Sequence, residues 1–578
     1  MKFLIKRTAE MKCFKSIIFS IIIVFASCKS IQSITKTPTF NGAINIPAKK
    51  GVLSDEEMKN WSHADILKDS IAGMSLKNAY KFLEGKKGVQ VIVAIADSGV
   101  DIEHEDLKDV LWINVDEISK NYKDDDNNGY IDDVYGWNFL GNKEGKIVNA
   151  DQLEITRIVK KGRERFGDKK VSEIAENHKE AYQQYLKVER EFLVTISEKK
   201  YEIKEMNQTL ENLKQVQENF DAVKQFSQKD TLTLAVLERL ETPSLSLLMQ
   251  VKNVINILKQ GMSEPDLKEY IQQVITYKDD IEKAIKGYNL EINFRQSLGD
   301  DLYNINDKFY GNNKVIGSKD LEKHGTHVAG IVAASRNNNL GAIGVANNVK
   351  IMTVRAVPEG DEHDKDVALG IRYAVDNGAK IINTSFGKRF SPNKEWVFDA
   401  LKYAASKDVL IVNAAGNDGE NMDVRKSYPT DTKDLTTEFT DNVITVGANS
   451  LHFNENLPAI FSNYGKINVD IFAPGVDVYA TIPKDKYEYL SGTSMAAPST
   501  SGVAALIRSY YPRLSAKKVK YILMNSGVKV TFDVIKPGSK TAENKKGELI
   551  SFSELSVSGS IVNAYNALLL ADFLTKKK

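Results

Sequence analysis

The stretch Val91-Ile92-Val93-Ala94-Ile95-Ala96-Asp97, followed by Ser98-Gly99, decides the fold class. An apolar run that ends in a carboxylate is typical of a buried strand in a parallel sheet. The run Val409-Leu410-Ile411-Val412 has the same character and leads into Asn413-Ala414-Ala415-Gly416-Asn417. Functional groups of such sheets gather beyond the C-terminal ends of the strands. We therefore predict an α/β protein with a parallel sheet flanked by helices and with Asp97 at its functional edge.

Two other segments carry the partners that Asp97 needs for nucleophilic chemistry. His324 begins the segment HGTHVAG (324–330), whose small residues allow a helix to pack closely while its first turn presents the imidazole. Ser494 lies in GTSMAAP (492–498), where a Gly-Thr turn enters a helical run of small residues. Serine is a poor nucleophile unless a base takes its proton, and the base works best when a carboxylate orients it.

The segments DSGVD (97–101), HGTHVAG and GTSMAAP resemble those of the subtilisin-like serine proteases, in which the triad has the chain order Asp, His, Ser. The resemblance implies hydrolysis of peptide bonds in a protein or peptide substrate. In that reading Ser494 attacks the carbonyl, His324 transfers the proton and Asp97 orients the imidazole. His327 lies on the same helix face, and we expect it to be a packed structural residue.

The same resemblance extends to the groups that bind the substrate. It implies that Asn417, together with the backbone N–H of Ser494, donates to the oxyanion. It assigns one wall of the substrate pocket to the segment 381–387, which would also pair with the substrate backbone. It places the turn before Asn417 at the same pocket. The substrate-binding residues are then Ser385, Phe386, Gly387, Ala415 and Gly416. Taken alone, Asn417 is equally typical of a turn, and residues 381–384 of an ordinary core strand.

The loop 124–133, with sequence DDDNNGYIDD, places oxygen ligands at alternate positions around a glycine, as the start of an EF-hand does. Tyr135 stands where the EF-hand would have its bidentate Glu. We predict a structural calcium ion held by Asp124, Asp126, Asn128 and Tyr130, with Asp132 or Asp133 completing the shell; a solvated acidic loop is the alternative. The family resemblance suggests a second calcium site at Asp106 and Asn338. No organic cofactor is expected.

The segment 144–310 interrupts the family pattern between the aspartate and the histidine. Residues 168–242 contain no Gly or Pro, and further helices are predicted at 244–259 and, from a capping box at Ser263, to 285. The spacings of three and four that indicate an amphipathic helix are those of Met206, Leu210, Leu213, Val216, Phe220 and Val223. We predict a helical hairpin or small bundle that either restricts access to the substrate cleft or serves as a brace or docking face.

The N-terminus combines five basic residues among the first fifteen with the apolar run 17–26, which predicts a signal peptide at 1–28. Ala26-Ser27-Cys28 resembles the lipobox of bacterial lipoproteins, although Phe25 departs from its usual aliphatic residue. The resemblance implies export to the cell envelope and a lipid on Cys28 that anchors the protein to a bacterial membrane. A plain secretory signal is the alternative. Residues 29–55 are predicted to form a flexible tether.

Composition adds few constraints. The 578 residues have a formal net charge of +1, so nothing points to nucleic acid. Both cysteines, Cys13 and Cys28, precede the tether, which leaves no disulfide framework. The catalytic domain is predicted to comprise 56–143 and 311–578, and the heptads are too irregular to predict a coiled-coil dimer, so we expect a monomer. The alternative function is a catalytically silent surface protein that binds through the helical insertion; loss of a triad residue would favour it, and none is lost.

Overall fold

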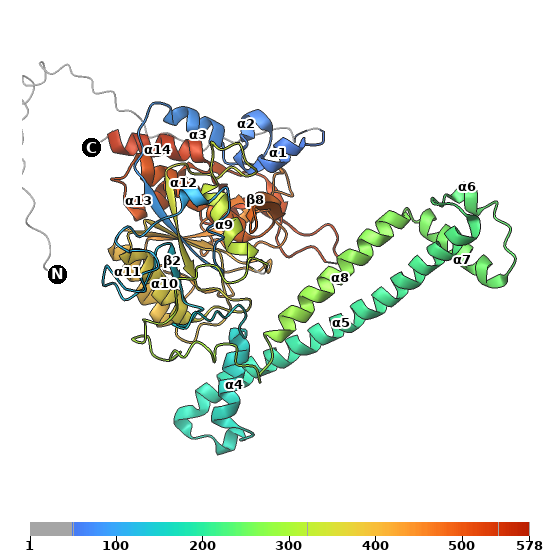
Figure 1. Ribbon diagram of the computed structural model, residues 1–578, viewed down its shortest axis with the longest axis horizontal. Coiled ribbons are helices and arrows are strands. Elements are labelled where there is room, and N and C mark those ends of the chain that lie inside the picture. The colour runs from blue at the N-terminus through green and yellow to red at the C-terminus, as the bar shows by residue number, and fades with distance from the viewer. Residues whose placement is uncertain (1–48, 50, 321, 542, 577–578) are drawn as a thin grey trace, which may run out of the picture. The chain divides into compact units, whose positions relative to one another are not determined.

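A sheet of mainly parallel strands lies at the centre of the catalytic domain (Figure 1). The computed structural model describes residue 49 and residues 51–320, 322–541 and 543–576, so the predicted signal peptide and Cys28 lie outside it. The strand order is β10-β13-β7-β6-β5-β4-β1-β3-β2, and only β10 runs antiparallel to its neighbour. The strands are β1 (Val91–Asp97), β2 (Gly136–Asn138), β3 (Val349–Arg355), β4 (Ile381–Thr384), β5 (Leu410–Ala414), β6 (Val443–Asn449), β7 (Ile471–Pro474), β10 (Val528–Lys529) and β13 (Ser560–Ile561).

Helices cover both faces of this sheet, and β1 shows why its sequence is apolar throughout. Val91, Val93 and Ile95 pack into one core, whereas Ala94 and Ala96 pack into the other. The predicted α/β fold is confirmed. The first core is covered by α3 (Leu76–Leu83), α9 (Lys323–Ala333), α12 (Thr493–Tyr510), α13 (Ala516–Ser526) and α14 (Ala564–Lys576), and the second by α10 (Asp364–Asp376) and α11 (Lys394–Ser406).

Smaller elements lie at the periphery of the domain. Helix α1 begins in the predicted tether with a capping box at Ser54, so ordered structure starts before residue 56. Two antiparallel hairpins flank the sheet, and the first of them directly precedes Ser494. These elements are α1 (Asp55–Lys59), α2 (Ile66–Asp69), β8 (Val478–Ile482), β9 (Lys486–Leu490), β11 (Asp533–Ile535) and β12 (Leu549–Ser551). In the described part of the chain, no helix is both long and apolar enough to cross a membrane.

The insertion is helical, as predicted, and forms an arm in which α5 and α8 lie side by side (Figure 1). The 49 residues of α5 correspond to about 74 Å at 1.5 Å per residue. Ser263 caps α8 with the predicted capping box, with Asp266 as its partner. A separate apolar cluster that includes Phe220, Val223 and Leu267 closes the far end. The helices are α4 (Glu154–Phe166), α5 (Lys179–Ser227), α6 (Leu234–Leu237), α7 (Leu245–Lys259) and α8 (Glu264–Lys286).

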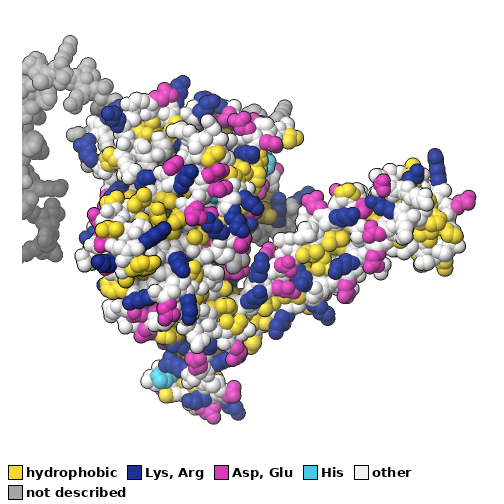
Figure 2. Space-filling view, in the orientation of Figure 1, with side chains coloured by type: hydrophobic (Ala, Val, Ile, Leu, Met, Phe, Trp, Pro, Cys, Tyr) yellow, Lys and Arg dark blue, Asp and Glu magenta, His cyan; other side chains and the backbone are white. Residues whose placement is uncertain are grey.

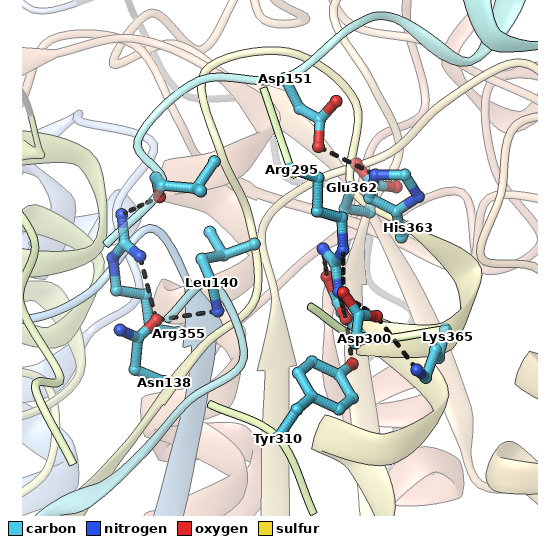
Figure 3. A network of polar contacts seen from close by, with 12 residues as sticks. Asn138, Leu140, Asp151, Arg295, Asp300, Tyr310, Arg355, Glu362, His363 and Lys365 are labelled. Atoms are coloured by element: carbon cyan, nitrogen blue, oxygen red, sulfur yellow. Dashed lines mark hydrogen bonds and ion pairs between the residues drawn. The ribbon is translucent and has the colours of Figure 1, made fainter. Parts of the chain in front are cut away.

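Buried charges fasten the segment after α8, through which the insertion returns, to the catalytic domain (Figure 3). The Arg295 guanidinium donates to both carboxylate oxygens of Asp366 at 2.6 and 2.7 Å and to those of Asp300 at 3.0 and 3.1 Å. Lys365 is 3.0 Å from both Asp300 and Asp307. Removing one partner of such a buried network commonly costs 3–5 kcal/mol, because the other charges stay buried. The roots of the insertion are therefore part of the catalytic domain's packing.

Candidate active site

Asp97 and His324 are in direct contact at the C-terminal edge of β1. Asp97 Oδ1 lies 2.7 Å from His324 Nδ1, and the Ser98 N–H donates to the same oxygen at 2.7 Å. His324 is the second residue of α9, and that helix approaches closely because residue 325 is glycine: a Cβ there would lie 2.2 Å from the Gly99 carbonyl oxygen. The sequence therefore places an imidazole on a buried carboxylate through one close helix contact.

The Asp97 carboxylate also determines the charge state of His324. Desolvation disfavours the imidazolium, but the charge of Asp97 and its hydrogen bond outweigh this effect, so the pKa of His324 is raised above its ordinary value. The His324 side chain is 40% exposed, whereas Asp97 is 1% exposed. Nε2 is consequently the ring nitrogen left for a substrate-side proton.

Ser494 is the second residue of α12, the helix that begins directly after the β8–β9 hairpin. Its hydroxyl donates to the Ser385 carbonyl at 3.2 Å, and the Ser385 hydroxyl donates to the Ser494 carbonyl at 2.9 Å. Among the described residues, no hydrogen bond joins Ser494 to His324. The Ser494 hydroxyl is therefore held at the end of β4 in this rotamer, and a turn about the Cα–Cβ bond would redirect it.

Asn417 is oriented as an oxyanion donor would need to be. Its Oδ1 accepts from the Thr493 N–H at 2.8 Å and from the Thr493 hydroxyl at 2.9 Å. The amide nitrogen is thereby the free end of an exposed side chain. Among the residues that the structure describes, none accepts from the Ser494 N–H, which lies in the first turn of α12, where the helix dipole favours negative charge.

The predicted substrate-binding residues divide into two groups. Phe386, Gly387 and Gly416 line a cavity of about 640 Å³ that includes Ser494 and Asn417. Ser385 and Ala415 are buried behind it, and Ala414 lines the cavity in place of Ala415 because successive side chains alternate across the sheet edge. Gly416 has φ +104, and a Cβ there would lie 2.4 Å from Asn463 Nδ2, so this turn requires glycine.

The insertion contributes one wall of the same cavity. The sequence alone did not decide between this position and a brace or docking face elsewhere. The cavity lining includes Glu191, Thr195 and Lys199 of α5, together with Leu153 and Ile155. His327, in contrast, is fully buried, and desolvation lowers its pKa to about 3. It contacts the Glu488 carbonyl at 3.0 Å, so it is a structural residue, as expected.

The acidic loop brings Asp124 and Asp126 together with Glu117, which the sequence analysis did not single out. One carboxylate oxygen from each of the three lies within 4.8 Å of the others. Burial, together with the charges of Asp133 and Asp126, raises the pKa of Glu117. Three carboxylates held this closely fit a hard cation with oxygen ligands. Glu117 precedes the loop in the chain, so no motif spacing points to it.

The other predicted ligands make hydrogen bonds. Asp132 accepts from the N–H groups of Asn121 and Tyr122, and Asp133 accepts from Asn114, Asn128 and Tyr373. Asn128 also donates to Asp126 at 3.0 Å. The Tyr130 ring packs edge-on against Trp137 and Tyr373.

At the second predicted calcium site, Asp106 and Asn338 lie together and are hydrogen-bonded. Asn338 Nδ2 donates to Asp106 Oδ1 at 2.6 Å, and the Ala342 N–H donates to Oδ2 at 3.1 Å. Asp106 is 1% exposed. Both of its carboxylate oxygens therefore already accept N–H donors from the 338–342 loop.

A carboxylate–imidazole pair and a serine, the latter two in the first turns of the packed helices α9 and α12 at one edge of a parallel sheet, form a candidate active site of the serine-hydrolase class. A model of the Subtilase family matches residues 172–551, and the chain belongs to this family.

Individual proteins are similar to this chain over part of their length. The chain is 43% identical to the thermophilic serine proteinase of Bacillus sp. (strain AK1) over 192 residues, which are 33% of this chain and 43% of that protein. It is 40% identical to subtilisin DY of Bacillus licheniformis over 203 residues, 34% of this chain and 67% of that protein. A solved protease from Pseudoalteromonas arctica is 30% identical, with a TM-score of 0.34 over 43% of this chain and 70% of that one. The chain thus spans less than half of the thermophilic proteinase.

Proposed function

We propose that the protein is a serine endopeptidase that hydrolyses peptide bonds in proteins or peptides. The observation that carries this proposal is the 2.7 Å contact of Asp97 with His324, which lies in the first turn of α9, a helix that packs against α12 with Ser494 in its own first turn. Membership of the Subtilase family and the names of the relatives support it. Action as a monomer is part of the proposal.

The reaction follows from the atoms at the site. The Ser494 hydroxyl turns from the Ser385 carbonyl to His324 Nε2, which takes its proton as Oγ attacks the substrate carbonyl carbon. The carbonyl oxygen becomes an oxyanion that accepts from Asn417 Nδ2 and the Ser494 N–H. His324 then gives the proton to the leaving amine, the C–N bond breaks, and water hydrolyses the acyl-enzyme by the same proton path in reverse. Asp97 keeps Nδ1 protonated throughout.

Replacement of the nucleophile tests this proposal. Ser494→Ala should reduce hydrolysis of casein to the residual rate that binding and the oxyanion donors supply, and it should abolish labelling by a fluorophosphonate probe. Ser491→Ala, three residues away and exposed, is the matched control and should retain both. Undiminished turnover by Ser494→Ala would remove the serine from the mechanism.

We propose further that the loop binds a structural calcium ion through Glu117, Asp124 and Asp126. Bound there, the ion would supply positive charge that neutralises the three carboxylates. This set retains two of the predicted ligands and adds one. The Asp106 and Asn338 pair is supported as a second site only by the family resemblance.

Export and lipid anchoring are also proposals, and they rest on the sequence of residues 1–28 alone. Cys28 would carry the lipid and hold the protein at the cell envelope. Globomycin treatment or Cys28→Ser should block processing or move the protein to the soluble fraction. A mature N-terminus other than Cys28 would favour the plain secretory signal.

A further inference from the structure

A second cavity of about 650 Å³ lies where the insertion meets the catalytic domain. Helix α4 and the first turns of α5 form one side of it, and the catalytic-domain segments 363–365 and 389–394 form the other. Glu191, Arg389 and Phe390 line both this cavity and the one that contains Ser494. The two cavities therefore adjoin along the base of α5, and we call the second one the junction cavity.

Every carboxylate that lines the junction cavity already has a cationic partner. Glu154 accepts from Arg157 and Lys388, each at 2.7 Å. Asp364 lies 2.8 Å from Lys388, and Glu191 accepts from Arg389. Negative charge in the wall is consequently balanced within the wall.

Several cations of the same lining have no such balance. Four cations of the lining make no ion pair with a carboxylate in the described part of the chain, and these are Lys161, Arg165, Lys187 and Lys394. All four are exposed. Lys161 lies 4.1 Å above the ring of Tyr303, and Arg165 lies 5.0 Å above that of Phe166. Along the arm, basic and acidic side chains are interspersed (Figure 2).

The base of α5 is held in place at the boundary between the two cavities. Glu191 pairs with Arg389 and lies 3.8 Å from Arg425, whose guanidinium also pairs with Glu420. One helix turn of the insertion is thus tied to two separate segments of the catalytic domain. The junction cavity is in this way built against the active-site cavity rather than on a separate surface.

We propose that the junction cavity binds an acidic segment of the polypeptide substrate while Ser494 cleaves a bond elsewhere in the same chain. The four cations come from α4, α5 and α11, so they are spread along the cavity and suit an extended chain of carboxylates better than one compact anion. Aromatic rings of Phe166, Tyr303 and Phe390 supply apolar contact between them. The proposal rests on the endopeptidase function, and it names the substrate class that this function prefers.

Cleavage of matched peptides tests the proposal. We would compare a fluorogenic peptide with uncharged flanks to the same peptide extended by four glutamates on the N-terminal or the C-terminal side. The extension on the side that reaches the junction cavity should lower KM and thereby raise kcat/KM about fivefold to tenfold. About 1 M NaCl should remove this gain, because the Debye length is then about 3 Å. Lys187→Glu/Lys394→Glu should bring the ratio of extended to uncharged substrate to about one. The double variant Lys214→Glu/Lys229→Glu, on the exposed arm, is the charge-matched control and should keep the ratio.

A binding measurement separates this proposal from the proposed catalysis. Fluorescein-labelled tetraglutamate peptide should bind the inactive Ser494→Ala protein with a salt-dependent anisotropy change, and Lys187→Glu/Lys394→Glu in that background should weaken it about tenfold. Binding of the peptide without turnover by the wild type would reject the endopeptidase function and keep the anion-binding site. Equal cleavage of all the peptides by an active wild type, or a gain that survives the lysine reversals, would reject the site and keep the endopeptidase.

Discussion

In the proposed mechanism, the charge of the His324 imidazole decides whether Ser494 can lose its proton. Asp97 raises its pKa, so the neutral base is available only above a pH higher than for an ordinary histidine. The same shift stabilises the folded protein at low pH: this stability is fully present below the unfolded pKa and is lost as pH rises through the folded pKa. Catalysis and this contribution to stability therefore change in opposite directions with pH.

Asp97→Asn should move the acid limb of the kcat/KM profile to lower pH, because the imidazolium loses its partner. The maximal rate should fall by about 10⁴, a magnitude already known for an Asp→Asn change in the triad of a chymotrypsin-type protease. Initial rates on a short peptide at closely spaced pH values measure both effects. Ser491→Ala serves again as a control with an unshifted profile. An acid limb unchanged in Asp97→Asn would mean that another group controls it.

Asn417 differs from Asp97 in that it would act only when charge develops on the substrate. Asn417→Ala should lower kcat by about 10²–10³ with little change in KM, which is the loss known for the equivalent donor in subtilisin. Thr493 holds the Asn417 side chain through two hydrogen bonds, so Asn417→Asp keeps the shape but removes the donor and should be as slow. A change confined to KM would place Asn417 in substrate binding alone.

At the scale of an element, the acidic loop is the clearest source of conditional stability. Removing calcium should lower Tm by roughly 2 °C, since a ligand at 100 times its Kd stabilises the fold by about 2.7 kcal/mol. Asp124→Asn/Asp126→Asn should show a much smaller effect of chelator, measured by scanning calorimetry with EDTA or excess Ca²⁺. Asp116→Asn, an exposed acid nearby, is the control and should respond as the wild type does. Equal melting with and without calcium would leave the loop hydrogen-bonded and metal-free.

At the scale of the whole molecule, the arm can be shortened without touching its buried roots. Deleting all of 145–305 would remove Arg295 and Asp300, which would leave the buried Asp366 without its guanidinium partner and Lys365 with Asp307 as its remaining carboxylate. Tyr277 and Glu202 are hydrogen-bonded at 2.5 Å, so a short Gly/Ser linker between them can replace 203–276. The apolar cluster at the far end of the arm is separate from the two cores of the sheet. The shortened enzyme should therefore fold.

If the arm restricts access, the shortened enzyme should cleave short peptides as before and digest a folded protein such as ribonuclease several-fold faster. The physical reason is steric, because α5 continues for about 42 Å beyond Lys199, the last of its residues that line the Ser494 cavity. Digestion rates of the folded substrate relative to a fluorogenic peptide measure the effect. Unchanged selectivity toward the two substrates would favour a docking role for the arm.

Much of this architecture is encoded locally. The apolar run 91–96 forms a strand that is buried on both faces, and Ser263 with Asp266 starts α8, because such features depend on neighbouring residues only. The contact between Asp97 and His324 was predictable because both side chains lie at ends of elements that meet at one sheet edge. The helical nature of 206–223 was predictable from its periodicity. The start of α5 at residue 179 was not, because residues 179–205 place charged side chains around much of the helix.

Tertiary structure alone decided which distant side chains meet. Glu117 joins Asp124 and Asp126 because the chain folds back on the loop. No sequence motif predicts this change of direction. Arg295 reaches Asp366 across 71 positions. Glu191 and Lys199 line the Ser494 cavity because the insertion's buried roots set where α5 lies against the sheet edge. Periodicity and motifs describe one element at a time, whereas these contacts depend on how elements pack. For this reason the sequence determined the chemistry of the site, and the fold determined its surroundings.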